Sequence, residues 1–306
     1  MYRALWKLLL IFLAFNIQFN LKANTFIKGE INFKFISPLN TFQNRDTTFI
    51  KKYLEIDDLY EKEDYTNSLR LALDLLNNIE GKEYKELEYL SNFIIGKIFS
   101  KRNDHEKSLS YFKKSLNLIQ RSNQLKEMEL RRYGDQLKLN KSIARTLLLI
   151  GVEYFRQNKK DSASVYFKKI VENSTLYNYS EIIASGYTNL TGIYLGESKF
   201  NLAKEYALKA INLHKRNNNK LFEASSMNNL ASIYLVEKNY DRAKDIYSNA
   251  IDLIKSDESI DAIKSKEDLY YNLAYVLYMQ KDYKGYEYLN QSYVFKDTLT
   301  DREIKR

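Results

Sequence analysis

Apolar and small residues recur at a fixed spacing along the second half of the chain. Residues 189–194 read Asn-Leu-Thr-Gly-Ile-Tyr, and residues 229–234 read Asn-Leu-Ala-Ser-Ile-Tyr. An aromatic residue and two alanines follow each segment at matching offsets: Phe200, Ala203 and Ala210, then Tyr240, Ala243 and Ala250. A period of about 40 residues made of two helical patterns is typical of a solenoid of helical hairpins.

Helical periodicity begins near residue 49 and continues to the end of the chain. Alignment on the small and aromatic residues gives six repeats, which start near Ile50, Tyr89, Ala144, Ala184, Ala224 and Glu267. The longest interval contains residues 120–141, where we expect extended helices around a turn near Gly134. Residues 24–48 form a lead-in, in which Ile31, Phe33 and Phe35 alternate as in an extended segment.

The repeated small residues have a steric explanation. Where two helices of a hairpin cross, a small residue on each helix lets the backbones approach closely. Ala203, Ala207 and Ala210 lie four and then three residues apart, so they share one helical face. A single hairpin cannot bury its apolar stripe alone, so we expect neighbouring hairpins to stack into a continuous core.

This arrangement resembles the tetratricopeptide repeat family over residues 49–296. The Leu-Gly pair in the first helix of the family's repeat corresponds to Ile95-Gly96 and Ile150-Gly151, and in altered form to Leu190-Thr191 and Leu230-Ala231. The mid-repeat aromatic of the family corresponds to Phe200, Tyr240 and Tyr283. The resemblance implies an all-α, right-handed superhelical solenoid of about six TPR-like helical hairpins, which presents a binding surface rather than a catalytic centre.

The chain departs from the family pattern in two respects. Its repeats are longer than the usual length of about 34 residues, and they lack the proline that closes the second helix. The outermost repeats are degenerate, with Glu55-Ile56 in place of Leu-Gly and Tyr286 in place of alanine. Terminal repeats often diverge because one side faces solvent, so the fold prediction is unchanged.

The first 23 residues have the pattern of a secretory signal peptide. Arg3 and Lys7 precede an apolar run from Leu8 to Phe15, and Ala23 offers a small residue for cleavage. The run is too short for an ordinary transmembrane helix. We therefore expect residues 1–23 to be removed and the protein to be periplasmic or secreted, with no membrane span after cleavage; an uncleaved membrane anchor is the alternative.

Composition narrows the possible functions. The chain has one proline and nine glycines among 306 residues, which favours a long helical protein, and it has no cysteine for a disulfide or a lipid anchor. Its net charge of +9 falls to +6 without Arg3, Lys7 and Lys22 (9 − 3 = 6), and the remaining charges are mixed. A mixed, mildly basic surface predicts no nucleic-acid partner.

The sequence contains no recognisable catalytic or metal-binding motif. Its two histidines, His105 and His214, lie far apart without spaced acidic companions, and we interpret both as exposed residues near helix ends. Gly186, Gly192 and Gly196 fall in a helical pattern without P-loop spacing, so we interpret them as packing residues. We expect no enzyme activity, no metal site and no cofactor.

The concave face is the remaining functional candidate. In the resembled family, this groove is lined by first-helix positions outside the core. Carried onto this chain, the groove residues are Tyr53, Asp57, Tyr60, Lys97, Lys101, Arg145, Arg156, Asn228, Ser232, Tyr271, Tyr275 and Tyr278. The groove would be basic in its first half and aromatic at its end, which suits a protein or peptide partner with acidic segments. Alternatively, the three last tyrosines pack on the C-terminal tail.

Two functions follow from this interpretation. The first is an exported, non-enzymatic scaffold that binds a protein or peptide in its groove. The second is the ligand-sensing module of a two-component or LuxR-type signalling system, with a signalling partner in the envelope. Residues 293–299 resemble the Lys-Asp-Ser-Leu element of exported sensor regions in Bacteroidetes kinases and regulators, and we expect the module to lack its output domain. A glycan-binding lipoprotein is disfavoured because the chain has no cysteine.

Overall fold

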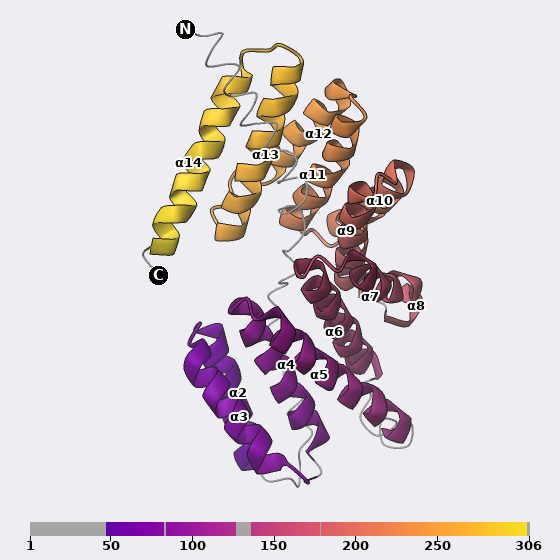
Figure 1. The fold of residues 1–306 in the computed structure, drawn as a ribbon, viewed down its shortest axis with the longest axis vertical. Helices are drawn as coiled ribbons and strands as arrows, with labels where there is room; N and C mark the ends of the chain where they lie inside the picture. The colour runs from indigo at the N-terminus through magenta and orange to yellow at the C-terminus, as the bar shows by residue number, and fades with distance from the viewer. Residues whose placement is uncertain (1–46, 83, 127–135, 178, 305–306) are drawn as a thin grey trace. The chain divides into compact units, whose positions relative to one another are not determined.

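The computed structural model describes residues 47–82, 84–126, 136–177 and 179–304, and all regular structure in these ranges is helical (Figure 1). The helices are α2 (Thr47–Glu61), α3 (Tyr65–Ile79), α4 (Lys85–Lys101), α5 (His105–Lys126), α6 (Gln136–Arg156), α7 (Lys160–Glu172), α8 (Ser174–Tyr177), α9 (Ser180–Gly196), α10 (Phe200–Arg216), α11 (Lys220–Val236), α12 (Tyr240–Leu253), α13 (Ile260–Met279) and α14 (Gly285–Ile304). The predicted signal peptide, almost all of the lead-in and the turn near Gly134 lie outside the described residues.

The chain divides into two compact units, one ending at Ile182 and the other beginning at Ile183. In the N-terminal unit each helix from α2 to α7 packs on the next one, and α2 also packs on α4. In the C-terminal unit each helix from α10 to α14 packs on the next one, and α11 also packs on α13. Within each unit the helices therefore stack as hairpins of an all-α solenoid, as the sequence predicts.

The six helical hairpins of the described chain share one turn. Each has a non-glycine residue with φ between 58° and 62° between its two helices: Glu63, Asn103, Asn158, Ser198, Lys238 and Lys281. The following backbone N–H donates to a carbonyl five residues earlier, as from Lys199 to Tyr194 at 2.9 Å. This bond satisfies a carbonyl at the end of the first helix and gives all six hairpins the same short connection.

Glycines allow the close helix crossings of the N-terminal unit. A Cβ atom on Gly96 would lie 2.7 Å from the ring of Phe112, and one on Gly151 would lie 2.5 Å from the ring of Phe167. The hydroxyl of Ser108 also donates to the carbonyl of Gly96 at 2.9 Å. The predicted role of these small residues is confirmed, because a larger side chain at either glycine would collide with the second helix.

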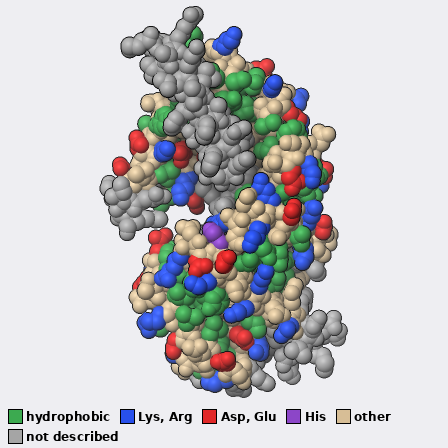
Figure 2. All heavy atoms as spheres, in the orientation of Figure 1, with side chains coloured by type: hydrophobic (Ala, Val, Ile, Leu, Met, Phe, Trp, Pro, Cys, Tyr) green, Lys and Arg blue, Asp and Glu red, His purple; other side chains and the backbone are tan. Residues whose placement is uncertain are grey.

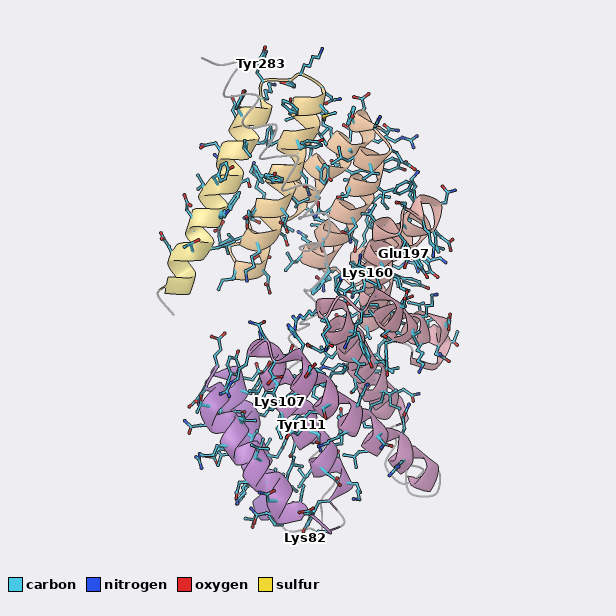
Figure 3. All side chains as sticks on the ribbon, in the orientation of Figure 1. Lys82, Lys107, Tyr111, Lys160, Glu197 and Tyr283 are labelled. Atoms are coloured by element: carbon cyan, nitrogen blue, oxygen red, sulfur yellow. The ribbon has the colours of Figure 1, made fainter. Side chains whose placement is uncertain are left out.

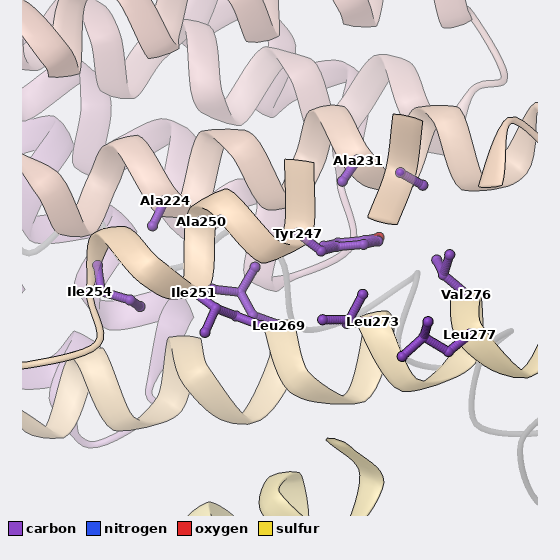
Figure 4. Packing of buried hydrophobic residues seen from close by; sticks show 11 residues of the cluster. Ala224, Ala231, Tyr247, Ala250, Ile251, Ile254, Leu269, Leu273, Val276 and Leu277 are labelled. Atoms are coloured by element: carbon purple, nitrogen blue, oxygen red, sulfur yellow. The ribbon is translucent and has the colours of Figure 1, made fainter. Parts of the chain in front are cut away.

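The core of the C-terminal unit shows the same principle with alanines (Figure 4). Ala224, Ala231 and Ala250 have no exposed surface, and they let α11 and α12 enclose the ring of Tyr247. Leu273 on α13 packs against this cluster from the next hairpin. Each hairpin is therefore stabilised by burial of apolar surface against its neighbour.

The long interval between the second and third repeats is helical at both ends. Helix α5 has 22 residues and α6 has 21, so both extend into the segment 120–141. The prediction of extended helices there is confirmed. None of the helices in the described ranges is both long and apolar enough to span a membrane.

Candidate functional site

The predicted groove residues all lie on first helices of hairpins, in two separate groups. The N-terminal unit carries one group, on α2, α4 and α6: Tyr53, Asp57, Tyr60, Lys97, Lys101, Arg145 and Arg156. The C-terminal unit carries the other, on α11 and α13: Asn228, Ser232, Tyr271, Tyr275 and Tyr278. Each group is described within its own unit.

Helices α2 and α4 bring a cation, an aromatic ring and a carboxylate together. The Nζ atom of Lys97 lies 3.7 Å from the ring centre of Tyr60, which is a close cation–π contact. Partial burial raises the pKa of the Asp57 carboxyl, while the nearby charges of Lys97 and Arg145 oppose the increase. We call the side of α2, α4 and α6 that carries the N-terminal group of predicted residues the first-helix face. It holds charged groups in a partly desolvated setting, where electrostatic interactions are stronger than in water.

Arg145 extends this cluster to α6. Its guanidinium lies 5.2 Å from the ring centre of Phe93 on α4. Burial lowers the pKa of Arg145, and the nearby Tyr89, Tyr53 and Asp57 oppose that decrease. Arg145 thus packs among aromatic rings in addition to carrying charge, so its replacement would disturb the helix packing.

A second cluster, which we call the Glu153 network, lies where α4, α5 and α6 meet. The side chain of Glu153 has no exposed surface, and its Oε1 accepts from Ser100 Oγ at 2.6 Å and from Arg156 Nη1 at 3.0 Å. Its Oε2 lies 2.8 Å from Nδ1 of His105. Arg156 Nη1 also donates to Ser100 Oγ at 2.6 Å, and Gln157 Nε2 donates to the carbonyl of His105 at 3.2 Å. The buried carboxylate is therefore fully partnered.

The Glu153 network contains serine, histidine and glutamate, but its order is wrong for nucleophilic catalysis. In a catalytic triad the imidazole lies between the hydroxyl and the carboxylate, so that it can take the hydroxyl proton. Here Ser100 and His105 contact separate oxygens of one carboxylate. The arrangement orders side chains and gives no sign of an activated nucleophile.

Sequence reasoning missed this network because its members lie far apart in the chain. Glu153 is 48 residues from His105 and 53 residues from Ser100. His105 has a 26% exposed side chain and a carboxylate partner, so the interpretation of a simple exposed residue was wrong. One feature of the sequence could have indicated the network, namely a glutamate inside an apolar run. Residues 147–155 read Leu-Leu-Leu-Ile-Gly-Val-Glu-Tyr-Phe, and Glu153 is the charged residue among them.

Two tyrosines of the predicted groove lie in the helix packing. Tyr53 is 2% exposed and Tyr60 is 7% exposed, and they continue the buried stripe of Ile50 and Ile56 on α2. The prediction of an accessible groove position is corrected for both residues. The physical reason is spacing, because positions three and four residues apart share the helix face that packs on the neighbouring hairpin.

Two polar residues of the C-terminal group are also buried. Ser232 is 2% exposed, and its hydroxyl donates to the carbonyl of Asn228 and lies 2.9 Å from Tyr247 Oη. Asn228 is 6% exposed, and its Oδ1 accepts from Asn272 Nδ2 at 3.0 Å. Their predicted groove role is corrected, because Ser232 joins α11 to α12 and Asn228 joins α11 to α13.

The three tyrosines of α13 are partly buried. The rings of Tyr275 and Tyr278 lie 6.3 Å apart, centre to centre. Burial raises the pKa of Tyr271 to about 12, and nearby Tyr293 of α14 contributes to the increase. This proximity favours packing against the last helix for Tyr271, which was the alternative interpretation from the sequence.

His214 lies in the core of the C-terminal unit. It is 1% exposed, its Nε2 lies 3.3 Å from Thr188 Oγ1, and its ring stacks on Phe222 at 5.6 Å. The Thr188 hydroxyl also contacts Ser226 at 2.9 Å. The prediction of an exposed histidine was therefore wrong. Burial lowers the pKa of His214 from 6.5 to about 4, so the imidazole is neutral at pH 7.

Figure 2 shows Lys and Arg interspersed with Asp and Glu over the described part of the face in view. Labelled Lys107 and Tyr111 lie on α5 (Figure 3), where Tyr111 stacks on Phe99 at 5.6 Å and Lys107 lies 5.2 Å from the Phe99 ring centre. Such lysine-covered rings stabilise a hairpin. Within the described ranges, no group of three or more acidic or histidine side chains is placed to hold a metal ion.

The described fold matches known repeat proteins. Residues 89–121 and 224–257 match the family model described as tetratricopeptide repeat. No curated protein sequence matches the chain. Three solved structures illustrate the similarity in fold.

The apo form of RapI has a TM-score of 0.61 at 13% identity, with 83% of this chain and 99% of RapI covered. The Rap conjugation gene regulator of the plasmid pLS20, in complex with the Phr* peptide, has a TM-score of 0.51 at 15% identity, and the match covers 83% of this chain and 74% of the regulator. A signal transduction ATPase from Pyrococcus horikoshii with a tetratricopeptide repeat sensor has a TM-score of 0.64 at 17% identity, and the match covers 87% of this chain and 39% of the ATPase. The chain therefore has the tetratricopeptide-repeat fold, and two of its hairpins match the family model directly.

Proposed function

We propose that the protein is a non-enzymatic scaffold that binds a peptide or protein segment on the first-helix face of its N-terminal unit. Helical repeat folds present extended surfaces on rigid elements, which suits recognition of another chain. The face combines aromatic rings and arginine, which are enriched where proteins bind one another, with lysines whose charge can steer a partner. The Rap regulator solved with the Phr* peptide supports this proposal by similarity of fold.

One observation carries the proposal, namely that the buried ring of Tyr60 holds Lys97 in place beside Asp57 and Arg145. The cation–π contact of 3.7 Å between Lys97 and Tyr60 holds the ammonium group over a ring. Arg145 shares the same surroundings, because its charge affects the pKa of Asp57. A face whose charged side chains are already ordered loses less conformational entropy when a partner binds.

We propose that the partner presents acidic residues. Lys97 and Lys101 lie one turn apart on α4, and Arg156 of α6 is joined to the Ser100 between them by a 2.6 Å bond. The acidic groups beside these cations are Asp57, Asp58 and Glu61 in the first cluster and Glu153 in the second. Lys97, Lys101 and Arg156 would attract an acidic segment mainly through faster association and better selectivity.

We also propose that the protein acts outside the cytoplasm after removal of residues 1–23. The basic start, the apolar run and the small residue Ala23 support this proposal. Mass determination of the N-terminus of the protein purified from its own cells tests it. A first residue of Asn24 is expected, and a retained Met1 would contradict cleavage.

Affinity capture tests the scaffold function. The full chain carries a C-terminal tag and is purified from its own cells next to a variant with Lys97→Gln and Lys101→Gln. A matched control carries Lys160→Gln and Lys168→Gln on α7, a second helix of the same unit. A partner captured by the wild type and by the control, but reduced in the first variant, supports the proposal. Equal capture by all three proteins contradicts the proposed face.

A ligand-sensing module remains the second candidate. Helix α14 continues through the Lys296-Asp297-Thr298-Leu299 element to Ile304, which gives a long last helix that can pass a change to a partner. The fold similarity to the tetratricopeptide repeat sensor of the ATPase supports this candidate. Capture of a membrane-spanning kinase or regulator that depends on α14 would favour sensing over a scaffold role.

A further inference from the structure

We infer that the Glu153 network holds Arg156 as a fixed anchor for an anionic side chain of the bound segment, with Glu153 as its positioning residue. This inference rests on the proposed function, since it specifies how the N-terminal unit would recognise an acidic segment. It gives a role to the buried Glu153 carboxylate, which contacts side chains from α4, α5 and α6.

The network is built from three different elements. Ser100 lies in the last turn of α4, His105 begins α5 and Arg156 ends α6, and all three contact the Glu153 carboxylate within 3.0 Å. Removing a carboxylate from water is costly unless several donors compensate for its lost hydration. Both oxygens of Glu153 have such donors, so the carboxylate is ordered and fixes the groups around it.

Arg156 is ordered through one nitrogen only. Among the described residues, its hydrogen bonds to Ser100 and Glu153 both come from Nη1. Its side chain remains 20% exposed, so the guanidinium is not enclosed. A guanidinium carries five N–H donors in a planar fork, and its Nε and Nη2 edge can bind a carboxylate with two parallel bonds. Fixing one nitrogen pre-orients that edge and lowers the entropic cost of binding.

Two further cations lie on α4 next to this network. Lys97 and Lys101 flank Ser100, and the 2.6 Å bond from Arg156 Nη1 to Ser100 Oγ places Arg156 beside that turn. A carboxylate bound by Arg156 would therefore also experience the field of two ammonium groups.

Matched peptides and four variants test the anchor. The probe is a fluorescein-labelled peptide of alternating Glu and Leu, and its control is the same peptide with Gln in place of every Glu. Binding of both to the full chain is measured by fluorescence anisotropy. The variants are Arg156→Gln, Arg156→Lys, Glu153→Gln and the double variant Glu153→Gln with Arg156→Gln. Lys160→Gln on α7 is the matched surface control. Thermal melting of every variant is recorded to identify loss of folding.

We expect Arg156→Gln to weaken binding of the Glu peptide about tenfold, since hydrogen bonds to charged groups contribute more than neutral ones. Binding of the Gln peptide should remain unchanged, and Arg156→Lys should restore part of the loss because it keeps the charge without the fork. Glu153→Gln should weaken only the Glu peptide, and it should add little once Arg156 is already Gln. This dependence distinguishes a positioning role from a general structural one.

Four results would overturn the inference. One is unchanged binding of the Glu peptide by Arg156→Gln. Another is an equal loss of both peptides in Glu153→Gln, also in the Arg156→Gln background. Equal affinity of the wild type for both peptides would reject the anionic anchor and leave the scaffold function standing. If the wild type binds neither peptide, the anchor is rejected, and affinity capture decides the proposed function separately.

Discussion

The buried His214 makes the stability of the C-terminal unit depend on pH. Its pKa falls from 6.5 to about 4 because burial disfavours the charged imidazolium. The unfolded chain therefore binds a proton at His214 between pH 6.5 and pH 4, while the folded chain does not. The contribution of His214 to stability is complete above pH 6.5 and is lost progressively as the pH falls toward 4.

The size of this effect follows from the two pKa values. At about 1.4 kcal/mol per pH unit, the fall from 6.5 to about 4 corresponds to roughly 3 kcal/mol. About 2 kcal/mol of this is lost between pH 6.5 and pH 5. We expect His214→Phe to remove that loss, because phenylalanine keeps the ring against Phe222 and has no titrating nitrogen. Thr188 retains its partners, the carbonyl of Ala184 and the hydroxyl of Ser226.

Urea unfolding followed by circular dichroism at pH 7 and pH 5 measures this difference. Other titrating groups contribute equally to both proteins, so subtracting the wild-type change from the variant change isolates His214. The free energy of unfolding of the wild type should fall by about 2 kcal/mol more than that of His214→Phe. An equal fall in both proteins would refute the assignment of a neutral, buried imidazole.

Three further substitutions test the packing and the turns. Gly151→Ala should destabilise the N-terminal unit by about 1–3 kcal/mol, because its Cβ would lie 2.5 Å from the Phe167 ring; a melting temperature at or above that of the wild type would contradict this. Lys238→Gly should raise stability by roughly 0.5–1 kcal/mol, since φ is 62° there; chemical denaturation decides the sign. Lys266→Met should cost about 2 kcal/mol in the same assay, because two backbone carbonyls lose the donor that Lys266 Nζ supplies at 2.7 and 2.8 Å; unchanged stability would show that water replaces it.

The repeat architecture was predictable from short-range sequence patterns. The spacing of alanines such as Ala243 and Ala250 defines a helical face, and both residues are fully buried. Gly96 and Gly151 were correctly identified as crossing points, because only a missing side chain admits the ring opposite. The shared turn was less visible, since residues such as Glu63 and Lys238 adopt positive φ without a glycine.

The candidate site was only partly predictable, because its contacts join repeats. The first-helix register selected Lys97 and Arg145, which lie near Asp57 in the structure, and their role in binding stays a prediction. It did not distinguish a groove position from the adjacent buried stripe, so Tyr53 was misplaced. The Glu153 network depends on side chains about fifty residues apart, and periodicity within one repeat carries no information about such pairs.

Site-specific photo-crosslinking tests the central claim most directly. A photoreactive amino acid replaces Lys101 on the first-helix face, and in a matched protein it replaces Val165, which is 51% exposed on the second helix α7. The proteins are irradiated in their own cells and the adducts are identified by mass spectrometry. We predict one discrete peptide or protein adduct from position 101 and none from position 165. The same adducts from both positions, or an adduct from position 165 alone, would contradict binding through the first-helix face.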